Sequence, residues 1–320
     1  MGVAEKIQQA KIERIKRQKR RDRITLLILL SALLSMCVGL FFGFKVIKEY
    51  MDEQRAERNL ENVRESMDGG MALLPDGADD MIRKLLADQN VVAESIEDPI
   101  EVSEEYLARL QRRVDFDSLL AINPDADSWL WIPDTNVDYY VMHEQKTDVY
   151  EYLWKDIYHQ SNGTGSLLRV HVPADQDDAH LLIFGHRMSR RDLMFANLVD
   201  WRDEEFAKTH QYVMMYYPDH SECWKVWTAS NVQGTSDVYK VPFELGSQKY
   251  QNLLDYTAQL GSYQLVPQPD KNTRTLYLST CDKAMGNQDT RFIVVCVPDI
   301  FYYYDTQTLS RGPLVVEEEW

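Results

Sequence analysis

A cysteine and an arginine stand ten residues apart in the segment TLYLSTCDKAMGNQDTRFIVV, residues 275–295. Cys281 ends one run of β-forming residues, and Arg291 opens the next. If the two runs pair as antiparallel strands, the link returns the chain to the same end of the sheet, and the two side chains lie together. A nearby cation stabilises a nucleophilic thiolate, and an arginine offers fixed donors to a developing oxyanion. Taken alone, the residues also fit a buried cysteine beside a rim arginine paired with Asp282 or Asp289.

A nucleophilic cysteine works with a histidine as its proton carrier, and the chain has seven histidines. His186 follows an apolar run and a glycine in LLIFGHRMSRRDLMF, so we predict it at a strand end, facing a cleft. His171 and His180 stand within or at the start of predicted strands, which favours packing or solvent exposure. A single histidine at a strand end also fits a structural role.

The segments around these residues predict short β-strands. Runs rich in β-branched and aromatic residues are bounded by turn signals such as Asn162-Gly163 and Pro218-Asp219. Helical patterns interrupt them at 191–207 and 247–261. Many short strands with few helices favour a barrel or sandwich over a parallel sheet with crossover helices. The eight predicted strands cover residues 129–133, 139–142, 166–172, 180–185, 211–217, 223–230, 275–280 and 291–297.

Two short helices are predicted ahead of the first strand. Ser103 is a favourable N-cap, and Glu104 and Glu105 suit the first turn of a helix that runs to about Val114. A second helix is predicted over residues 116–122.

Composition limits the class of protein. With 320 residues, 44% of them apolar, the chain has the length for one or two domains with an ordinary core. Four scattered cysteines without a CxxC spacing argue against a disulfide framework and give no zinc motif. The net charge of −16 argues against nucleic acid, which needs a basic surface. The acidic run 175–178 lacks an EF-hand pattern, so we predict a solvated turn there rather than a calcium site.

The charge is split between a short basic tail and an acidic remainder. Residues 1–23 carry nine Lys or Arg and three acidic residues, a charge of about +6, which leaves the rest near −22. Residues 24–44 are twenty-one residues without a charge, enough for a helix to cross the hydrocarbon core. We predict a permanent anchor over 24–46, because a cleaved signal peptide has a shorter apolar stretch and a small-residue cleavage site. The basic flank predicts a cytoplasmic N-terminus and places the rest of the chain outside the cell.

The chain resembles the sortases, and class B in particular, in several motifs together: the anchor, FGHRM, LYLSTCD and TRF. These are the membrane-anchored cysteine transpeptidases of Gram-positive bacteria. The resemblance covers residues 115–300 and includes SWLWIPDTNVDYYVM, YLWKDIY and GTGSLLRV, and the helix at 247–261 matches the inserted helix of class B. Ser128, Tyr140 and Arg187 depart from the usual glycine, proline and asparagine, which bears on substrate preference.

The resemblance implies a mainly β fold. We expect a closed eight-stranded sortase-type β-barrel with N-terminal helices and an inserted helix, preceded by a transmembrane helix and a helical stalk. The predicted parts are a cytoplasmic basic tail (1–23), a transmembrane anchor (24–46), an extracellular helical stalk or linker (47–114), a catalytic domain (115–304) and an acidic C-terminal tail (305–320).

The resemblance also implies a role for each residue of the site. Cys281 attacks the bond after a threonine in the C-terminal sorting signal of a secreted protein, His186 is the general acid and base, and Arg291 stabilises the oxyanion. The thioester passes to an amine of a cell-wall precursor or to a pilin lysine. No metal, cofactor or nucleic acid is implied. Residues 24–46 are expected to contact membrane lipid. The positions that match substrate-contacting residues of class B are Leu153, Thr235, Tyr239, Ser279 and Asp282.

Two other functions stay open on the sequence. One is a catalytically inactive, membrane-anchored sortase-like protein that binds partners or acts as a scaffold. The intact set Cys281, His186 and Arg291 argues against it. The other is a purely hydrolytic cysteine peptidase, which forms the same thioester as a transpeptidase.

Overall fold

The computed structural model of the chain describes residues 3–67, 100, 102–143, 150–170, 178–188, 192–281 and 289–311. The chain forms two compact units, Met1–Asp52 and Glu53–Trp320. Parts of the predicted stalk and of the predicted C-terminal tail, at 68–99 and 312–320, lie outside the described residues.

The first unit is the N-terminal part of helix α1 (Val3–Ser66). Its most apolar 18-residue window has a mean hydropathy of 2.6, and none of that window is buried inside the protein. The serine hydroxyls of the apolar segment turn back onto the helix: Ser31 Oγ donates to Ile28 O at 2.8 Å, and Ser35 Oγ donates to Ser31 O at 2.9 Å. Hydroxyls satisfied by their own helix suit a hydrocarbon environment, so α1 is a candidate membrane anchor.

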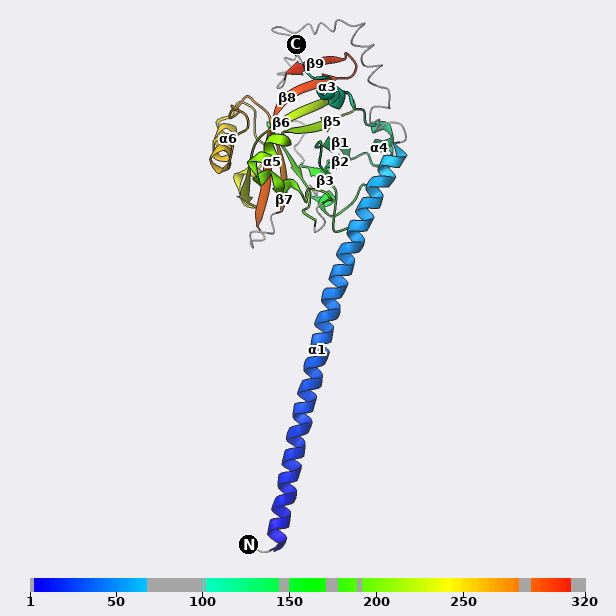
Figure 1. Cartoon of the computed structure of the whole chain (residues 1–320), viewed down its shortest axis with the longest axis vertical. Coiled ribbons are helices and arrows are strands. Elements are labelled where there is room, and N and C mark those ends of the chain that lie inside the picture. Colours follow the sequence, from blue (N-terminus) through cyan, green and yellow to red (C-terminus); the bar gives the residue numbers. More distant parts are fainter. Residues whose placement is uncertain are drawn as a thin grey trace. The chain divides into compact units, whose positions relative to one another are not determined.

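The second unit is built on a closed β-barrel (Figure 1). Strands β6 and β8 pair with each other as well as with their neighbours, which closes the order β6-β5-β1-β2-β3-β4-β7-β8 into a ring. Strand pairs β2–β3 and β4–β7 are parallel. The predicted eight-stranded barrel is therefore confirmed. The strands are β1 (Ala126–Trp131), β2 (Asp138–Met142), β3 (Leu167–Arg169), β4 (His180–Phe184), β5 (Tyr212–Tyr216), β6 (His220–Gln233), β7 (Thr275–Cys281) and β8 (Thr290–Tyr303).

A further strand, β9 (Thr308–Arg311), extends the sheet beyond the barrel by pairing with β8. It lies within residues 305–320, where the sequence predicts an acidic tail. The strand is four residues long and none of them is buried, so it lacks the apolar alternation by which strands are recognised in a sequence.

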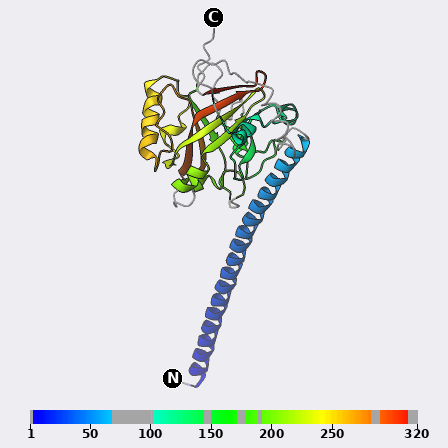
Figure 2. The same ribbon diagram turned by 45° about the horizontal axis from the view of Figure 1, so that its top comes forward.

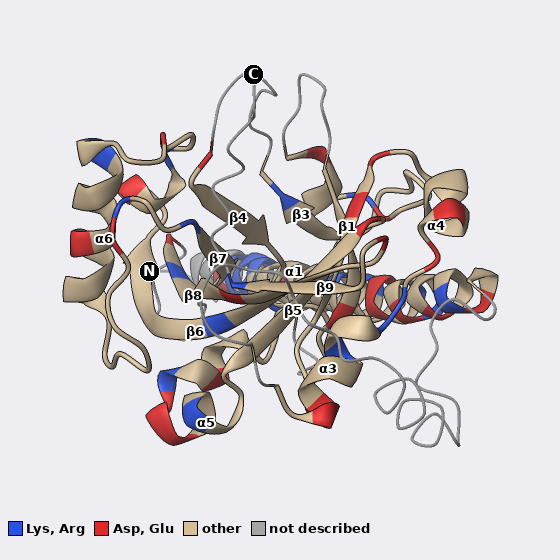
Figure 3. Cartoon of the chain, turned by 90° about the horizontal axis from the view of Figure 1, so that it is seen from above, with Lys and Arg blue, Asp and Glu red and all other residues tan. Residues whose placement is uncertain are grey.

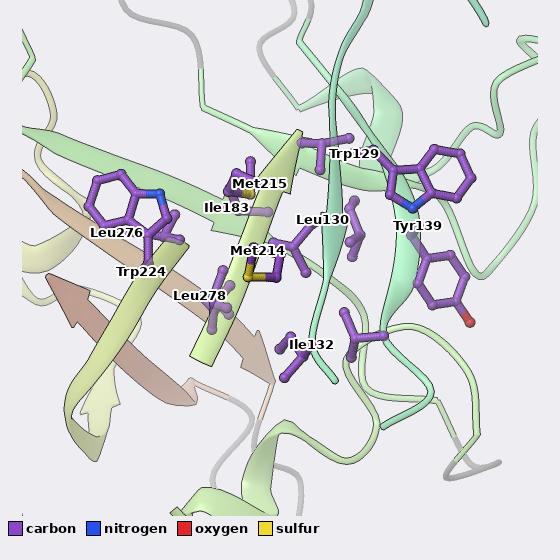
Figure 4. Packing of buried hydrophobic residues seen from close by; sticks show 14 of the residues in the cluster. Trp129, Leu130, Ile132, Tyr139, Ile183, Met214, Met215, Trp224, Leu276 and Leu278 are labelled. Carbon is purple, nitrogen blue, oxygen red and sulfur yellow. The ribbon is translucent and has the colours of Figure 1, made fainter. Parts of the chain in front are cut away.

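Large apolar side chains from the strands form the main core (Figure 4). Trp129 is fully buried, and its Nε1–H donates to Asp138 Oδ1 at 2.6 Å. Arg112 Nη2 donates to the same carboxylate oxygen at 2.9 Å, so the buried indole has the polar partner that it needs. Other members of this core are Leu130, Ile132, Tyr139, Ile183, Met214, Met215, Trp224, Leu276 and Leu278.

The helix predicted at 247–261 is confirmed as α6 (Gln248–Leu260). Ser247 caps it, accepting a hydrogen bond from Tyr250 N at 3.1 Å. Leu253 and Leu254 of α6 form a second apolar cluster with β-strand residues that include Trp227 and Tyr277. Figure 2 shows α6, in yellow, covering the outside of the barrel.

The two predicted N-terminal helices are also confirmed, as α3 (Glu104–Gln111) and α4 (Phe116–Ile122). Ser103 accepts a hydrogen bond from Tyr106 N at 3.2 Å, as an N-cap does. Helix α3 ends earlier than the predicted Val114, because Arg112 turns the backbone to φ −52° and ψ 134°.

The helical pattern at 191–207 corresponds to two short elements rather than to one continuous helix. The described residues form a 3₁₀ turn, η2 (Leu198–Arg202), and a separate helix, α5 (Glu204–Thr209). Asp203 separates them, because it adopts extended dihedrals (φ −84°, ψ 118°) and its carboxylate accepts from Glu205 N at 3.0 Å. An aspartate that caps the following helix interrupts the preceding one.

The last turns of α1 belong to the second unit, which begins at Glu53. Val63 and Met67 are buried there. Asn59 Nδ2 donates to Asp156 Oδ2 at 2.6 Å, and Arg64 Nη2 donates to Asp138 O at 2.8 Å. Figure 3 shows the positions of the acidic and basic residues mainly on helices and loops, whereas the strands of the barrel are mostly tan.

Candidate active site

Cys281 and Arg291 are direct cross-strand partners at one rim of the barrel. Strand β7 ends at Cys281, β8 begins at Thr290, and the antiparallel register pairs Cys281 with Arg291. Directly opposite residues have side chains on the same face, about 5 Å apart at Cβ. Both side chains are half-buried. The predicted antiparallel pairing, with Cys281 opposite Arg291, is confirmed.

His186 reaches the same rim from the other neighbour of β7. Strands β4 and β7 run parallel with Phe184 opposite Ser279, and Gly185 N donates to Ser279 O at 3.0 Å. Thr280 Oγ1 then donates to Gly185 O at 2.8 Å. One residue beyond Gly185 and Thr280 stand His186 and Cys281, so the register carries the imidazole to the side of the thiol away from β8.

Glycine is required at position 185. A Cβ there would lie 2.5 Å from Phe195 Cδ2 and 2.6 Å from Leu167 Cδ2, closer than non-bonded carbons approach. The absence of a side chain lets the chain pass close to its neighbours just after the end of β4, and His186 follows immediately.

A backbone carbonyl orients the imidazole. His186 Nε2 lies 2.7 Å from Leu153 O, in the 3₁₀ turn η1 (Glu151–Leu153). A carbonyl only accepts, so Nε2 carries a hydrogen and donates it to Leu153 O. The indole of Trp154 also packs on this imidazole, with the ring centroids 4.9 Å apart. The carbonyl and the indole together fix the orientation of the ring.

The loop that carries Leu153 is fixed by buried polar groups. Asp156 is 1% exposed, and its Oδ1 accepts from Tyr158 N at 3.0 Å and Gln160 N at 2.9 Å. Gly165 has φ +58°, and a Cβ there would lie 2.2 Å from Leu153 O. Only a residue without a side chain fits beside this carbonyl and adopts that backbone conformation freely.

Tyr239 and Ser279 form the wall beside the thiol. Tyr239 lies in the 3₁₀ turn η3 (Asp237–Tyr239), its hydroxyl is 3.0 Å from Ser279 Oγ, and its ring stacks on Phe184 at 5.6 Å. Burial raises the pKa of Tyr239, and the Arg291 guanidinium opposes the rise while the Cys281 thiol adds to it. The hydroxyl therefore stays protonated and lies close enough to both groups to interact with them.

The same connection between β6 and β7 carries the exposed Thr235. Its neighbour Gly234 donates its N–H to Asp289 O at 2.6 Å, and a Cβ at Gly234 would lie 3.8 Å from the guanidinium of Arg291. Thr235 is thus on a segment that touches Arg291. The structure brings Leu153, Tyr239 and Ser279 around the rim of Cys281, and Asp282 lies outside the described residues.

A family model for the sortase domain matches residues 130–299, more than half of the chain. This chain belongs to the sortase family. Sortases are cysteine transpeptidases, and the match spans Cys281, His186 and Arg291.

Curated relatives and solved structures of sortase B confirm the resemblance to class B. Sortase B of Listeria monocytogenes is 24% identical over 178 residues, 55% of this chain and 70% of the relative. Sortase B of Staphylococcus aureus is 21% identical over 264 residues, 82% of this chain and 93% of the relative.

Two structural neighbours share the fold of this sortase. A Staphylococcus aureus sortase B–substrate complex has a TM-score of 0.56 at 17% identity, covering 82% of this chain and 100% of that one. Sortase B from B. anthracis in complex with AAEK1 also has a TM-score of 0.56, at 18% identity, covering 78% and 98%. The barrel is therefore of the sortase type.

The other thiols of the sortase barrel are buried. Cys223 and Cys296 are fully inaccessible, and burial raises the pKa of Cys223 to about 12 and also raises that of Cys296. Cys281 is half-buried at the rim. Because thiol reactivity needs access, Cys281 is the cysteine of this unit whose position allows a reaction with a substrate.

The structure also places residues that the sequence interpretation set aside. His180 is fully buried, and burial lowers its pKa to about 3, so it stays neutral in the second apolar cluster. Of the two alternatives predicted for it, packing or solvent exposure, the structure shows packing, whereas His171 lies outside the described residues. In the part of the chain that the structure describes, no group of three or more His, Cys, Asp or Glu side chains is arranged to hold a metal ion.

Sequence reasoning missed the contact between the Leu153 carbonyl and His186, and the parts of Asp156 and Gly165 in holding it. Gly165 stands in the GTGSLLRV motif, and a glycine in a turn is a signal for positive φ. Nothing in the sequence connects that turn to the histidine, which is twenty-one residues away.

Proposed function

We propose that Cys281, His186 and Arg291 catalyse the sortase reaction on a C-terminal sorting signal. The Cys281 thiolate attacks the carbonyl carbon of a threonine, the C–N bond that follows it breaks, and the leaving amine takes a proton from the His186 imidazolium. An amine acceptor then attacks the thioester and gives a proton back to His186, and the C–S bond breaks to restore the thiolate. Arg291, with a backbone N–H, stabilises the oxyanion in both steps.

The observation that carries this proposal is the strand register. It sets Arg291 opposite Cys281 on one side, and the β4–β7 pairing brings His186 to the other. An acyl transfer needs its nucleophile between a proton carrier and an oxyanion donor, and this order supports the assignment.

For the donor peptide we propose a cleft formed by Leu153, Thr235, Tyr239, Ser279 and Asp282. Leu153 and Tyr239 give it apolar walls, and Ser279 adds a hydroxyl next to the nucleophile. The support is the position of the described members around Cys281 and the resemblance of all five to substrate-contacting positions of class B.

For the acceptor we propose a primary amine, from a cell-wall peptide or a pilin lysine. One solved structural neighbour is described as sortase B complexed with triglycine, a peptide with a free amine. That likeness supports an amine as the second substrate here.

The experiment that tests the function is a ligation assay on the full chain in detergent. Peptides carrying a library of sorting signals are incubated with and without triglycine, and the products are identified by mass spectrometry. The proposed function gives an acyl-enzyme at Cys281 and a peptide–triglycine product. A product that is only hydrolysed would establish the hydrolytic peptidase instead, and no acyl-enzyme with any signal would support the scaffold.

We further propose that the candidate anchor holds the sortase domain outside the cell. The basic segment 1–23 precedes the apolar helix, and such a flank stays in the cytoplasm. Protease added to intact protoplasts of cells that express the chain is expected to remove the domain after the anchor. A domain that is digested only after lysis would show the opposite orientation.

Replacement of Tyr239 by phenylalanine is expected to raise KM for the sorting peptide about two- to tenfold. The variant loses the hydrogen bond between the Tyr239 hydroxyl and Ser279 Oγ, which lie in the proposed cleft. The ring keeps its stack on Phe184, so the melting temperature is expected to change little. Steady-state kinetics and a melting curve measure both. A large loss of stability with unchanged KM would make the hydroxyl a structural group, and Tyr250→Phe, whose hydroxyl bonds Ala179 O at 3.0 Å away from the site, is the matched control.

A further inference from the structure

Trp154 is exposed to a degree unusual for a tryptophan. Its relative exposure is 59%, whereas tryptophans are among the most buried side chains on average. The other described tryptophans of this chain are buried or half-buried: Trp129, Trp131, Trp201, Trp224 and Trp227. An indole left in water forgoes the stabilisation that burial would give it, so its position invites a functional explanation.

The exposed ring is held in place by the loop around it. Trp154 N donates to Glu151 O at 3.0 Å, and Asn162 N donates to Trp154 O at 3.0 Å. The backbone is therefore fixed on both sides of the residue. The indole also packs on the His186 imidazole at 4.9 Å, so the ring is both exposed and positioned.

The strand order shows on which side of the reaction Trp154 lies. Across the rim, Arg291 comes from β8, Cys281 from β7 and His186 from the end of β4. Trp154 packs on His186 from the connection between β2 and β3. It is thus on the side of the proton carrier that is remote from the oxyanion donor.

Acyl transfer uses the two sides differently. The carbonyl oxygen of the acyl group is directed to Arg291, and the amine leaves and arrives next to His186. A free amine in water at neutral pH is largely protonated. The face of an indole attracts such a cation, and tryptophan does so best among the aromatic side chains.

We propose that Trp154 binds the acceptor, by receiving its ammonium group on the indole face before transfer. This rests on the proposed transpeptidase function. The bound ammonium releases one proton to water, and its nitrogen attacks the thioester carbon. His186 takes the second proton as the new C–N bond forms and the C–S bond breaks.

Among the described residues of the same turn, no carboxylate is available to bind the ammonium group in place of the indole. Glu151 is the one acidic residue of η1, and its carboxylate is in an ion pair with Lys155. Among the described residues of this turn, the indole is therefore the group that binds a cation beside His186. It contacts only the ammonium group and leaves the rest of the acceptor unrestricted.

The test separates transfer from thioester formation in the full chain. Trp154→Leu keeps an apolar side chain against the imidazole but removes the aromatic face, and Trp154→Phe restores an aromatic face. For Trp154→Leu we expect KM for triglycine to rise about fivefold relative to KM for hydroxylamine, which is uncharged near pH 7.5. Because Trp154 also packs on His186, any change in thioester formation is measured separately, and the two acceptors share it. Trp154→Phe is expected to recover most of the rise for triglycine.

Tyr256→Leu is the matched control, because Tyr256 is an aromatic residue of α6 that is 38% exposed; its KM for triglycine is expected to be that of the unmodified chain. If Trp154→Leu slows thioester formation and transfer equally, or affects hydroxylamine as much as triglycine, Trp154 is not an ammonium site. An unmodified chain that forms the thioester but never ligates triglycine would instead overturn the transpeptidase function itself.

Discussion

Replacement of Cys281 by alanine is expected to abolish turnover and leave the fold intact. The thiolate is the group that forms the covalent bond to the acyl carbon, and neither Arg291 nor His186 can replace it. Loss of a nucleophile leaves only the contribution of binding and oxyanion stabilisation, so we expect kcat to fall by at least about 10³-fold. Cys281 is half-buried at a strand end, so the change in stability should stay near or below ~1 kcal/mol.

Cys296→Ala is the matched control for this experiment. Cys296 is fully buried in β8, so its truncation is expected to lower the melting temperature through the cavity that it leaves while kcat is retained. A thiol-directed reagent should modify Cys281 in the folded chain and spare Cys223 and Cys296. Full activity in Cys281→Ala, or labelling of a buried cysteine in its place, would contradict the assignment.

The elements with a strong local signal could be predicted from the sequence. Helix α6 carries a serine cap and apolar residues at helical spacing, and the strands of the barrel alternate or are apolar throughout. The elements that were missed lack such a signal. Strand β9 has no buried residue and pairs with the free edge of β8, and the exposed Asp203 divides 191–207 because its carboxylate caps α5.

The candidate site also has parts that the sequence predicts and parts that it does not. The rim with Cys281, Arg291 and His186 follows from side-chain types at the ends of predicted strands, and the register of β7 confirms the first two as partners. The resemblance to class B suggests Leu153 as an apolar wall, but its carbonyl is what touches His186. Every residue has a carbonyl, so no residue type marks this role, and only the folded loop held by Asp156 and Gly165 reveals it.

Arg291→Lys distinguishes a catalytic guanidinium from a structural one. The structure sets Arg291 opposite Cys281, with Nη1 donating to Thr290 O at 3.3 Å and with the Cβ position of Gly234 3.8 Å from the guanidinium. If Arg291 only pairs with a carboxylate at the rim, lysine should substitute well, because exposed ion pairs contribute about 0–1 kcal/mol. If it holds the oxyanion, lysine keeps the charge but loses the planar fork that aims the donors.

For the oxyanion role we expect Arg291→Lys to fold normally and to lose at least an order of magnitude in kcat. Removal of an oxyanion donor typically costs about 10²–10³ in kcat, or ~2.7–4 kcal/mol, and lysine should recover part of it. KM for the sorting peptide should change little, because the interaction strengthens only as the tetrahedral intermediate forms. Arg202→Lys is the control. The Arg202 guanidinium lies 5.0 Å from the ring centroid of Phe292, and Phe292 is the residue that follows Arg291 in β8. The measurement is steady-state kinetics of each variant on one cleavable peptide. A near-native kcat in Arg291→Lys would make Arg291 a structural residue. A loss in kcat alone, seen in Arg291→Lys and not in Arg202→Lys, is expected of a group that stabilises the transition state.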